Sequence, residues 1–343
     1  MKQVVDVLVG GQYGSEAKGL IGSLIPLENK YDFLVSVNSA QAGHTGYHIK
    51  SGKYFVTRHL PCACINDEQA TIFVGAGAII NLQVLEDEIK HFEANNIPVL
   101  GRLIISSEAT VITDADVYDE KEEKLGDRIG STCEGVGMAL SKRIRRQTKA
   151  FKDYYKDFLA LNKWGTEDIK MCNLPLSGHI FLEGSQGFAL SLFSGHYPFC
   201  TSRDTTSSAF LSYARLSPRA VRDIYGVYRT FPIRVGGNSG DIKNEVTWED
   251  VADISGYDNL AEFTTVTKRM RRVAMWDSKL ARESMVVNGV NKPIVTFLNY
   301  LDSKVEGKAE LTPKIKEWLQ STEKATGVVW HGYSTGKNNY FKR

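Results

Sequence analysis

The 343-residue chain has no apolar run that approaches the roughly 18 residues a membrane-spanning helix needs. Its first residues, MKQVVDVLV, carry charges within a short apolar stretch and no small-residue cleavage site, which is typical of a first strand and not of a signal peptide. Cysteine is scarce, and its five copies show neither zinc-ligand spacing nor the pattern of a disulfide framework. We therefore expect a cytoplasmic protein without membrane contact.

Neither sign of charge is in excess. Lysine and arginine number 42 and aspartate and glutamate 40, so the formal net charge is only +2. A dedicated nucleic-acid binder carries a strong basic excess, so we expect no nucleic-acid partner, although a local basic pocket for phosphates is compatible with this balance. The chain also lacks internal repeats and low-complexity linkers, and its 42% of hydrophobic residues is ordinary for a folded globular protein.

Short apolar runs rich in β-branched residues recur along the chain and predict buried strands at 4–9, 32–37, 71–74, 103–105, 180–182, 223–228 and 294–298. Helical patterns lie between them, as in residues 82–94, where Leu85, Ile89 and Phe92 recur at helical spacing. This alternation predicts an α/β fold with a doubly wound, mostly parallel central sheet and ligands bound beyond the carboxyl ends of its strands. Residues 151–173 show no clear period and are either a helical insertion or a lid.

The strongest local signal is the run GGQYGSEAKG at residues 10–19, between the first predicted strand and a predicted helix over 20–27. A glycine-rich turn with a lysine at a helix start suits a phosphate, because backbone N–H groups and the lysine charge face it. The run departs from the standard P-loop, with Ala17 in place of the second glycine and Gly19 in place of the Ser/Thr. A second motif, QAGHTG at residues 41–46, also follows a buried strand and places His44 near the same ligand.

These two motifs resemble those of adenylosuccinate synthetases, which read GTQWGDEGKGK followed by GGxNAGHT. The resemblance continues in order through IGST (129–132), EGSQG (183–187), YPFCTS (197–202), RVGG (234–237), TKRMRR (267–272) and STG (334–336). It implies one catalytic domain over residues 1–343, with a P-loop-like nucleotide-binding loop and small inserted subdomains. The length resembles that of the compact archaeal and phage members.

The resemblance also implies a reaction. The γ-phosphate of a nucleoside triphosphate moves to O6 of a purine nucleotide, and the amine of L-aspartate then displaces it. This chemistry needs an acid at O6, cations on the phosphates and cationic groups on two carboxylates. By resemblance, Ser15, Lys18, His44 and Gln186 form the reacting centre, with His44 as the acid at O6 and Gln186 on the purine edge.

Further roles follow by the same resemblance. Substrate contacts fall on Ser15, Gln41, Thr132, Arg146, Gln186, Thr201, Val235, Thr267, Arg269 and Arg271. Among these, Arg269 and Arg271 hold aspartate, and Arg146 reaches the active site of the neighbouring subunit of a homodimer. Contacts to the triphosphate fall on Gly14, Glu16, Ala17, Lys18, Gly19, Gly43, His44, Thr45, Asn299, Ser334 and Gly336, and Mg²⁺ contacts on Ser15 and Gly43.

Three departures from the family pattern bear on the substrates. The aspartate of the family's GDEGKG loop, which deprotonates N1 of the purine, is here Ser15, and a hydroxyl is a poor base at neutral pH. The smaller side chain leaves room for the 2-amino group of guanine. The guanine-reading TKLD segment is here TFLN (296–299), which favours ATP or dATP over GTP, and the GGHN run is replaced by Ser39-Ala40-Gln41 with no predictable effect.

Together these departures resemble the phage enzymes that make the diaminopurine nucleotide precursor from dGMP and aspartate, with ATP or dATP as phosphoryl donor. The product expected is N6-succino-2-amino-2′-deoxyadenylate. N1 deprotonation is then left without a residue, and a carboxylate of bound aspartate is one candidate. Two alternatives stay open, an ordinary adenylosuccinate synthetase that uses IMP and GTP, and a non-catalytic nucleotide sensor. Phosphate release that requires both aspartate and a purine monophosphate would exclude the sensor.

Overall fold

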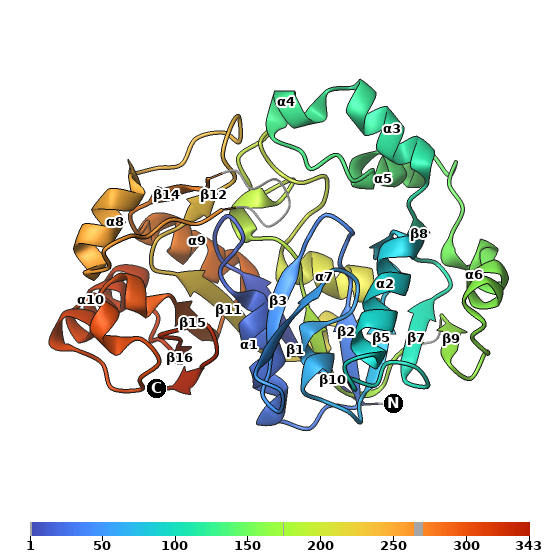
Figure 1. Cartoon of the computed structure of the whole chain (residues 1–343), viewed down its shortest axis with the longest axis horizontal. Helices are drawn as coiled ribbons and strands as arrows, with labels where there is room; N and C mark the ends of the chain where they lie inside the picture. Colours follow the sequence, from blue (N-terminus) through green and yellow to red (C-terminus); the bar gives the residue numbers. More distant parts are fainter. Residues whose placement is uncertain (1, 174, 264–269) are drawn as a thin grey trace.

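The computed structural model describes residues 2–173, 175–263 and 270–343 of the chain (Figure 1). Ten strands of this described part form one central sheet, in the order β17-β16-β15-β11-β1-β10-β2-β5-β7-β9. Their bounds are β1 (Gln3–Gly10), β2 (Phe33–Ser36), β5 (Thr71–Val74), β7 (Leu103–Ser106), β9 (Ile169–Cys172), β10 (Gly178–Glu183), β11 (Val221–Arg229), β15 (Lys292–Thr296), β16 (Gly332–Tyr333) and β17 (Phe341–Lys342). Neighbouring strands pair in parallel, apart from β16 and β17. The predicted α/β fold with a mostly parallel sheet is confirmed.

Helices lie on both faces of this sheet and beyond one end of it (Figure 1). They are α1 (Lys18–Leu24), α2 (Leu82–Glu93), α3 (Asp114–Glu122), α4 (Leu125–Ile129), α5 (Val136–Ile144), α6 (Tyr155–Asn162), α7 (Ser207–Ala214), α8 (Trp248–Ser255), α9 (Ser278–Asn288) and α10 (Pro313–Thr326). One core joins α1, α2 and α6 to Leu8 and its neighbours on one face, and a second joins α7, α8, α9 and α10 to Val7 and Val9 on the other. Because side chains alternate along a strand, β1 supplies both cores.

Smaller elements are added at the edges of this frame. They are a hairpin of β3 (His44–His48) and β4 (Lys53–Thr57), a pair of β6 (Ile79–Ile80) and β8 (Thr110–Val111), and a sheet of β12 (Ile233–Arg234), β13 (Glu245–Val246) and β14 (Arg272–Ala274). Helices α3, α4 and α5 gather beyond one end of the central strands, at the top of Figure 1. No helix in the described ranges is long and apolar enough to cross a membrane.

Each of the seven predicted strands is present, but the last of them ends earlier in the structure than the sequence predicts. The run 294–298 predicts a strand to Leu298, whereas β15 ends at Thr296 and Leu298 lies in a short 3₁₀ helix, Leu298–Tyr300. Phe297 has a φ of +59°, which no strand residue adopts, so the chain turns there. The helix predicted over 20–27 begins two residues earlier, at Lys18, and continues as a 3₁₀ turn over Ile25–Leu27.

Residues 151–173 contain a helix, together with an edge strand that the sequence does not predict. The helix is α6, and the strand β9 pairs with β7 at one end of the central sheet. Phe151, Phe158 and Ile169 are buried in the same core as α2. The segment therefore completes the sheet.

The loop between β1 and α1 has a left-handed backbone at three positions. Gly14, Ser15 and Ala17 have φ values of +89°, +59° and +65°. Only glycine adopts this region without cost, so the methyl group of Ala17 strains the loop just before α1. The departure from a P-loop at Gly19 has a steric reason, because a side chain there would lie 2.6–2.8 Å from the backbone of Thr45.

This geometry predicts opposite effects for two substitutions in one loop. We expect Ala17→Gly to raise the free energy of unfolding by roughly 1 kcal/mol, because the left-handed strain is relieved. Gly14→Ala is the matched reverse change, since its methyl group would meet only Leu190 at 3.6 Å and would add backbone strain alone. Urea titration of both variants measures the effect. A loss of stability in Ala17→Gly would show that packing of the methyl group outweighs the strain.

Candidate active site

A cavity of about 720 Å³ opens where the carboxyl ends of β1, β15 and β16 meet the loops after β2 and β10. Ligands of parallel α/β sheets bind at this edge, because the connecting loops diverge there. The residues of the sequence prediction that line it are Gly14, Ser15, Ala17, Lys18, Gly19, Gln41, Gly43, His44, Thr45, Thr132, Gln186, Val235, Arg271, Asn299, Ser334 and Gly336. Segments that lie more than 300 residues apart in the sequence thus share one site.

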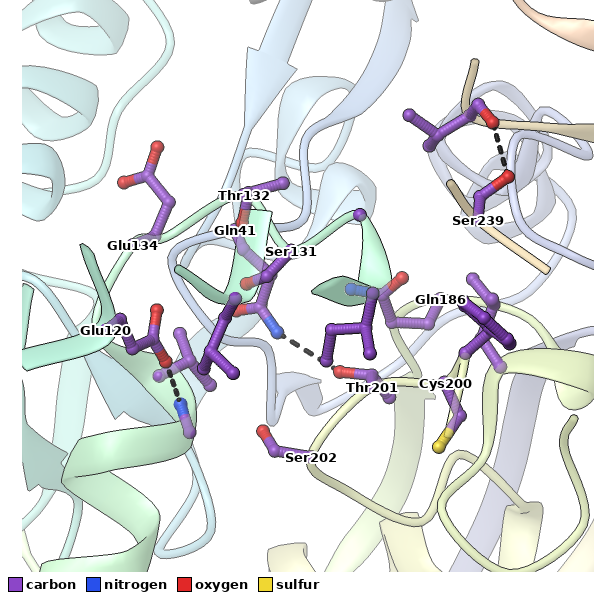
Figure 2. Close-up of a pocket in the computed structure, with 18 of the residues that line it drawn as sticks. Gln41, Glu120, Ser131, Thr132, Glu134, Gln186, Cys200, Thr201, Ser202 and Ser239 are labelled. Atoms are coloured by element: carbon purple, nitrogen blue, oxygen red, sulfur yellow. Dashed lines mark hydrogen bonds between the residues drawn. The ribbon is translucent and has the colours of Figure 1, made fainter. Parts of the chain in front are cut away.

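A second cavity of about 190 Å³ adjoins the first. The two share a wall made by Tyr13, Gln41, Thr132, Gln186, Leu190 and Val235. Figure 2 shows Gln41 and Thr201 turned toward one another in the smaller cavity, and the Gln41 Nε2 lies 3.4 Å from the Thr201 hydroxyl. Hydroxyl groups of Ser131 and Ser202 lie nearby, so this end offers donors for an anionic group (Figure 2).

A buried carboxylate holds the loop after β1. Glu16 is fully buried, and its Oε1 accepts hydrogen bonds from the backbone N–H of Gln12 at 3.0 Å and of Gly14 at 2.8 Å. Its Oε2 lies 3.3 Å from the Lys18 Nζ, and Lys18 also donates to the backbone carbonyl of Gln186. The two loops that carry Lys18 and Gln186 are therefore tied together beside the cavity.

The catalytic candidate His44 is oriented by a second buried carboxylate. His44 is 7% exposed, and its Nδ1 lies 2.6 Å from Oε1 of Glu183, the last residue of β10. The other oxygen, Oε2, accepts the backbone N–H of Cys62 at 2.7 Å. Because a carboxylate only accepts, the Nδ1 of His44 carries a proton and its Nε2 remains for a ligand. Such a histidine can stabilise negative charge or pass a proton.

The aspartate-clamp candidate Arg271 shares its charge partner with a residue that the sequence analysis missed. Its Nη1 lies 3.4 Å from Glu262 Oε2, and Glu262 also pairs with the fully buried Arg229. Burial raises the pKa of Glu262, but the two guanidinium groups outweigh it and hold that pKa below its usual value. Arg229 further donates to the backbone carbonyl of Ser15 at 3.1 Å and lies over the ring of Phe297 at 4.1 Å.

Not every predicted residue reaches the two cavities. Thr267 and Arg269 lie outside the described residues. Arg146 is exposed after α5 and is absent from the walls of both cavities, and Thr201 lines only the smaller one. The side chain of Glu16 lies beneath the loop, where it organises the backbone and makes no wall.

Sequence reasoning assigned no role to several charged residues of the site. Arg229 ends a buried strand, so its position at a carboxyl edge was a signal that went unused. Lys337 lines the larger cavity directly after the STG motif, and Glu183 opens the EGSQG motif. Glu262 stands in a loop without a motif, and no feature of the sequence marks it.

The oxygens predicted to contact Mg²⁺ suit that ion. Mg²⁺ is a hard cation that takes oxygen ligands and often rests mainly on substrate phosphates and water. Ser15 and Gly43 both line the larger cavity and offer a hydroxyl and a carbonyl oxygen. These neutral groups fit a Mg²⁺ ion that arrives with the phosphates of a triphosphate.

Comparisons with known proteins agree with this site. The family model of adenylosuccinate synthetase matches residues 7–173 and 166–322. The chain is 34% identical over 348 aligned positions to the adenylosuccinate synthetase of Methanocaldococcus jannaschii, an alignment that covers 98% of this chain and 96% of that protein. It is 33% identical to that of Thermococcus sibiricus, over 94% of this chain and 93% of the relative.

Two solved structures share the fold. The succinoaminodeoxyadenylate synthetase of cyanophage S-2L, bound to dGMP and to dATP as an energy donor, superposes with a TM-score of 0.82 at 25% identity, over 100% of this chain and 96% of that one. The fully ligated adenylosuccinate synthetase of Plasmodium falciparum has a TM-score of 0.79 at 20% identity, over 99% and 100%. The chain belongs to the adenylosuccinate synthetase family of C–N ligases, which join aspartate to a purine nucleotide with Mg²⁺ and a nucleoside triphosphate.

Proposed function

We propose that this chain joins L-aspartate to C6 of dGMP, with ATP or dATP as phosphoryl donor, and forms N6-succino-2-amino-2′-deoxyadenylate. The observation that carries the proposal is Ser15 in the wall of the larger cavity, where the family pattern has aspartate. The likeness to a phage enzyme described with dGMP and dATP supports it. The archaeal relatives, which are more similar in sequence, are named adenylosuccinate synthetases, and they favour the rival function of an ordinary adenylosuccinate synthetase.

Ser15 suits a purine that carries a 2-amino group. Guanine has this amine beside N1, where hypoxanthine has only hydrogen. The short Ser15 side chain leaves space at that edge, and its hydroxyl can accept a hydrogen bond from the amine. The carbonyl of Ser15 is held by Arg229, so the residue keeps its place in the loop. An aspartate here would add volume and negative charge at the same point.

The reaction then takes two steps. In the first step the N1 proton leaves to a carboxylate of bound aspartate and the O6–P bond forms. The bond from the γ-phosphorus to its bridging oxygen breaks at the same time, which releases ADP or dADP. The aspartate amine next attacks C6, and the C6–O6 bond breaks to release phosphate. His44, with its Nδ1 held by Glu183, presents Nε2 to O6, and Lys18 balances phosphate charge at the loop.

The remaining substrate contacts follow the two cavities. The smaller one, with Thr132 and Thr201, receives the 5′-phosphate of dGMP, and Arg146 of a second subunit adds a cation to it. Arg271 and Arg269 hold the carboxylates of aspartate. Asn299 contacts the base of the triphosphate. We infer that residues 1–343 act as one catalytic domain in a homodimer, since cavity walls draw on segments from Tyr13 to Lys337.

Competition kinetics tests the substrate assignment. With both nucleotides present, we expect the chain to consume dGMP in preference to IMP when aspartate, Mg²⁺ and ATP are supplied. Preference for IMP would replace the proposal with the ordinary adenylosuccinate synthetase activity.

Replacement of His44 by Ala should lower kcat by roughly 10²–10⁴-fold, the usual contribution of a general acid, with less effect on nucleotide KM. Glu183→Gln keeps a polar side chain but removes the charge that orients Nδ1, and should also lower kcat. Steady-state kinetics of both variants measures this. Unchanged turnover in His44→Ala would remove this residue from the chemistry.

Replacement of Arg271 by Leu should chiefly raise the KM for aspartate, by about tenfold or more, because a charge-assisted contact to a carboxylate is lost. Arg282→Leu, at an exposed position on α9, is the matched control and should change nothing. Initial rates at varied aspartate and varied dGMP separate the effects. A normal KM for aspartate with a raised KM for dGMP would assign Arg271 to the nucleotide.

Replacement of Ser15 by Asp should shift preference from dGMP toward IMP. Aspartate accepts a left-handed backbone better than most residues, so the φ of +59° is no obstacle. The larger side chain crowds the 2-amino group, and a shift of about 1 Å in the base can cost on the order of 10²-fold in rate. With IMP, the new carboxylate can take the N1 proton.

Ser15→Asn is the control for that change, because it has the size of aspartate without the negative charge. It should lower dGMP turnover without raising IMP turnover. The ratio of kcat/KM for the two nucleotides is the measurement. If Ser15→Asp raises dGMP turnover as much as IMP turnover, Ser15 does not make room for a 2-amino group, and the proposal loses its main support.

A further inference from the structure

The end of the larger cavity that receives the triphosphate base is built around Asn299, in the short 3₁₀ helix after β15. Asn299 is only 6% exposed, and its side-chain oxygen Oδ1 is buried without a hydrogen-bond partner. A buried, unpaired amide oxygen is costly unless a ligand satisfies it. Its presence in a cavity wall therefore marks a place where a ligand donor belongs.

The nitrogen of the same amide is engaged by residues outside the family motifs. Asn299 Nδ2 donates to the hydroxyl oxygen of Tyr257 at 3.0 Å, and that hydroxyl donates to Glu306 Oε2 at 2.8 Å. Tyr257 follows α8, and Glu306 lies in the loop after the 3₁₀ turn Ser303–Val305. Three segments thus meet in one chain of hydrogen bonds.

The donors and acceptors in this chain of hydrogen bonds can be assigned in only one way. A carboxylate can only accept, so the single hydrogen of Tyr257 is used on Glu306. The Tyr257 oxygen must then accept from Asn299, and only the amide nitrogen of Asn299 can donate. Burial raises the pKa of Tyr257, so the phenol stays protonated near neutral pH and keeps this role. The amide is therefore fixed with its nitrogen toward Tyr257, and its unpaired Oδ1 forms the other branch.

The fixed amide discriminates between purine bases. The edge of guanine at N1 and N2 presents two donors, which a carboxylate with two accepting oxygens can satisfy. The edge of adenine at N6 and N1 presents one donor and one acceptor, which matches the oxygen and the remaining N–H of an amide. Without the hydrogen bond to Tyr257 the amide can rotate by about 180°, and the positions of its donor and acceptor toward the cavity are no longer fixed.

Aromatic rings hold the same corner together. The rings of Phe297 and Tyr300 lie 5.1 Å apart, and the ring of Tyr257 meets that of Tyr300 edge-on at 6.4 Å. Both Phe297 and Tyr300 line the cavity, whereas Tyr257 and Glu306 are absent from its walls. Tyr257 thus packs behind the wall, where its ring contacts Tyr300 and its hydroxyl contacts Asn299.

We propose that Tyr257 and Glu306 are positioning residues that set the amide orientation of Asn299 and thereby make the site select an adenine over a guanine nucleotide as phosphoryl donor. This inference rests on the proposed function, which assigns the donor role to ATP or dATP. It adds two residues, neither of which touches the ligand, to the determinants of that choice.

Isothermal titration with ADP and with GDP in the presence of Mg²⁺ tests the inference on the whole chain. The unmodified protein should bind ADP more tightly than GDP. Tyr257→Phe removes the hydroxyl but keeps the ring contact, and should reduce the ratio of the two dissociation constants by about tenfold, the scale of one base-edge contact. The dissociation constant for dGMP should stay the same.

Glu306→Gln tests the direction of the hydrogen bonds. Because Glu306 is exposed, this substitution leaves the packing of the core unchanged. Glutamine can donate to Tyr257, which frees the phenol hydrogen for Asn299 and permits the opposite amide orientation. The ADP-to-GDP preference should fall here too. Glu310→Gln, an exposed change in the same loop, is the control and should keep the preference.

The outcomes separate this inference from the proposed function. A fall in preference in both variants but not in the control supports the positioning role. An unchanged preference in Tyr257→Phe or in Glu306→Gln overturns it, even where overall affinity drops, because a merely structural role weakens ADP and GDP alike. A preference of the unmodified protein for GDP would instead refute the adenine donor of the proposed function itself.

Discussion

The active site depends most on the contacts that the carboxylate of Glu16 makes. This carboxylate accepts hydrogen bonds from two backbone N–H groups of the loop after β1 and pairs with the ammonium of Lys18. Lys18 in turn donates to the backbone carbonyl of Gln186 in the loop after β10. A fully buried carboxylate is costly without such partners, so the loop has few other ways to fold around it. Because the walls of both cavities include Gln186, this network places the larger cavity, proposed for the triphosphate, against the smaller one, proposed for the monophosphate.

Carboxylates also pair with basic side chains elsewhere in the site. Glu183 orients His44, and Glu262 balances Arg229 and Arg271, so these three basic side chains each have a buried or half-buried carboxylate beside them. The partners hold side chains in position before a substrate arrives, which reduces the reorganisation that the reaction requires. Two proposed contact residues, Ser15 and Asn299, have neutral side chains and depart from the family pattern, and these two positions carry the proposed substrate assignment.

Much of this was accessible from the sequence, for physical reasons that differ between elements. Strands such as β1 and β10 are buried on both faces, so continuous apolar runs reveal them, and glycine-rich motifs after them reveal the carboxyl edge. The end of β15 was missed because the turn at Phe297 depends on a left-handed backbone that this residue type rarely adopts. Tyr257, Glu262 and Glu306 were missed because their contacts are with residues about 30–50 positions away in the chain. The partner of Tyr257 is Asn299, that of Glu262 is Arg229, and that of Glu306 is Tyr257.

The central claim is that the neutral side chain at Ser15 accommodates guanine. Product identification by mass after incubation with aspartate, Mg²⁺ and each pairing of dGMP, GMP or IMP with ATP or GTP tests it most directly. We expect N6-succino-2-amino-2′-deoxyadenylate from dGMP and ATP as the main product. Formation of adenylosuccinate from IMP, with dGMP recovered unchanged, would contradict it.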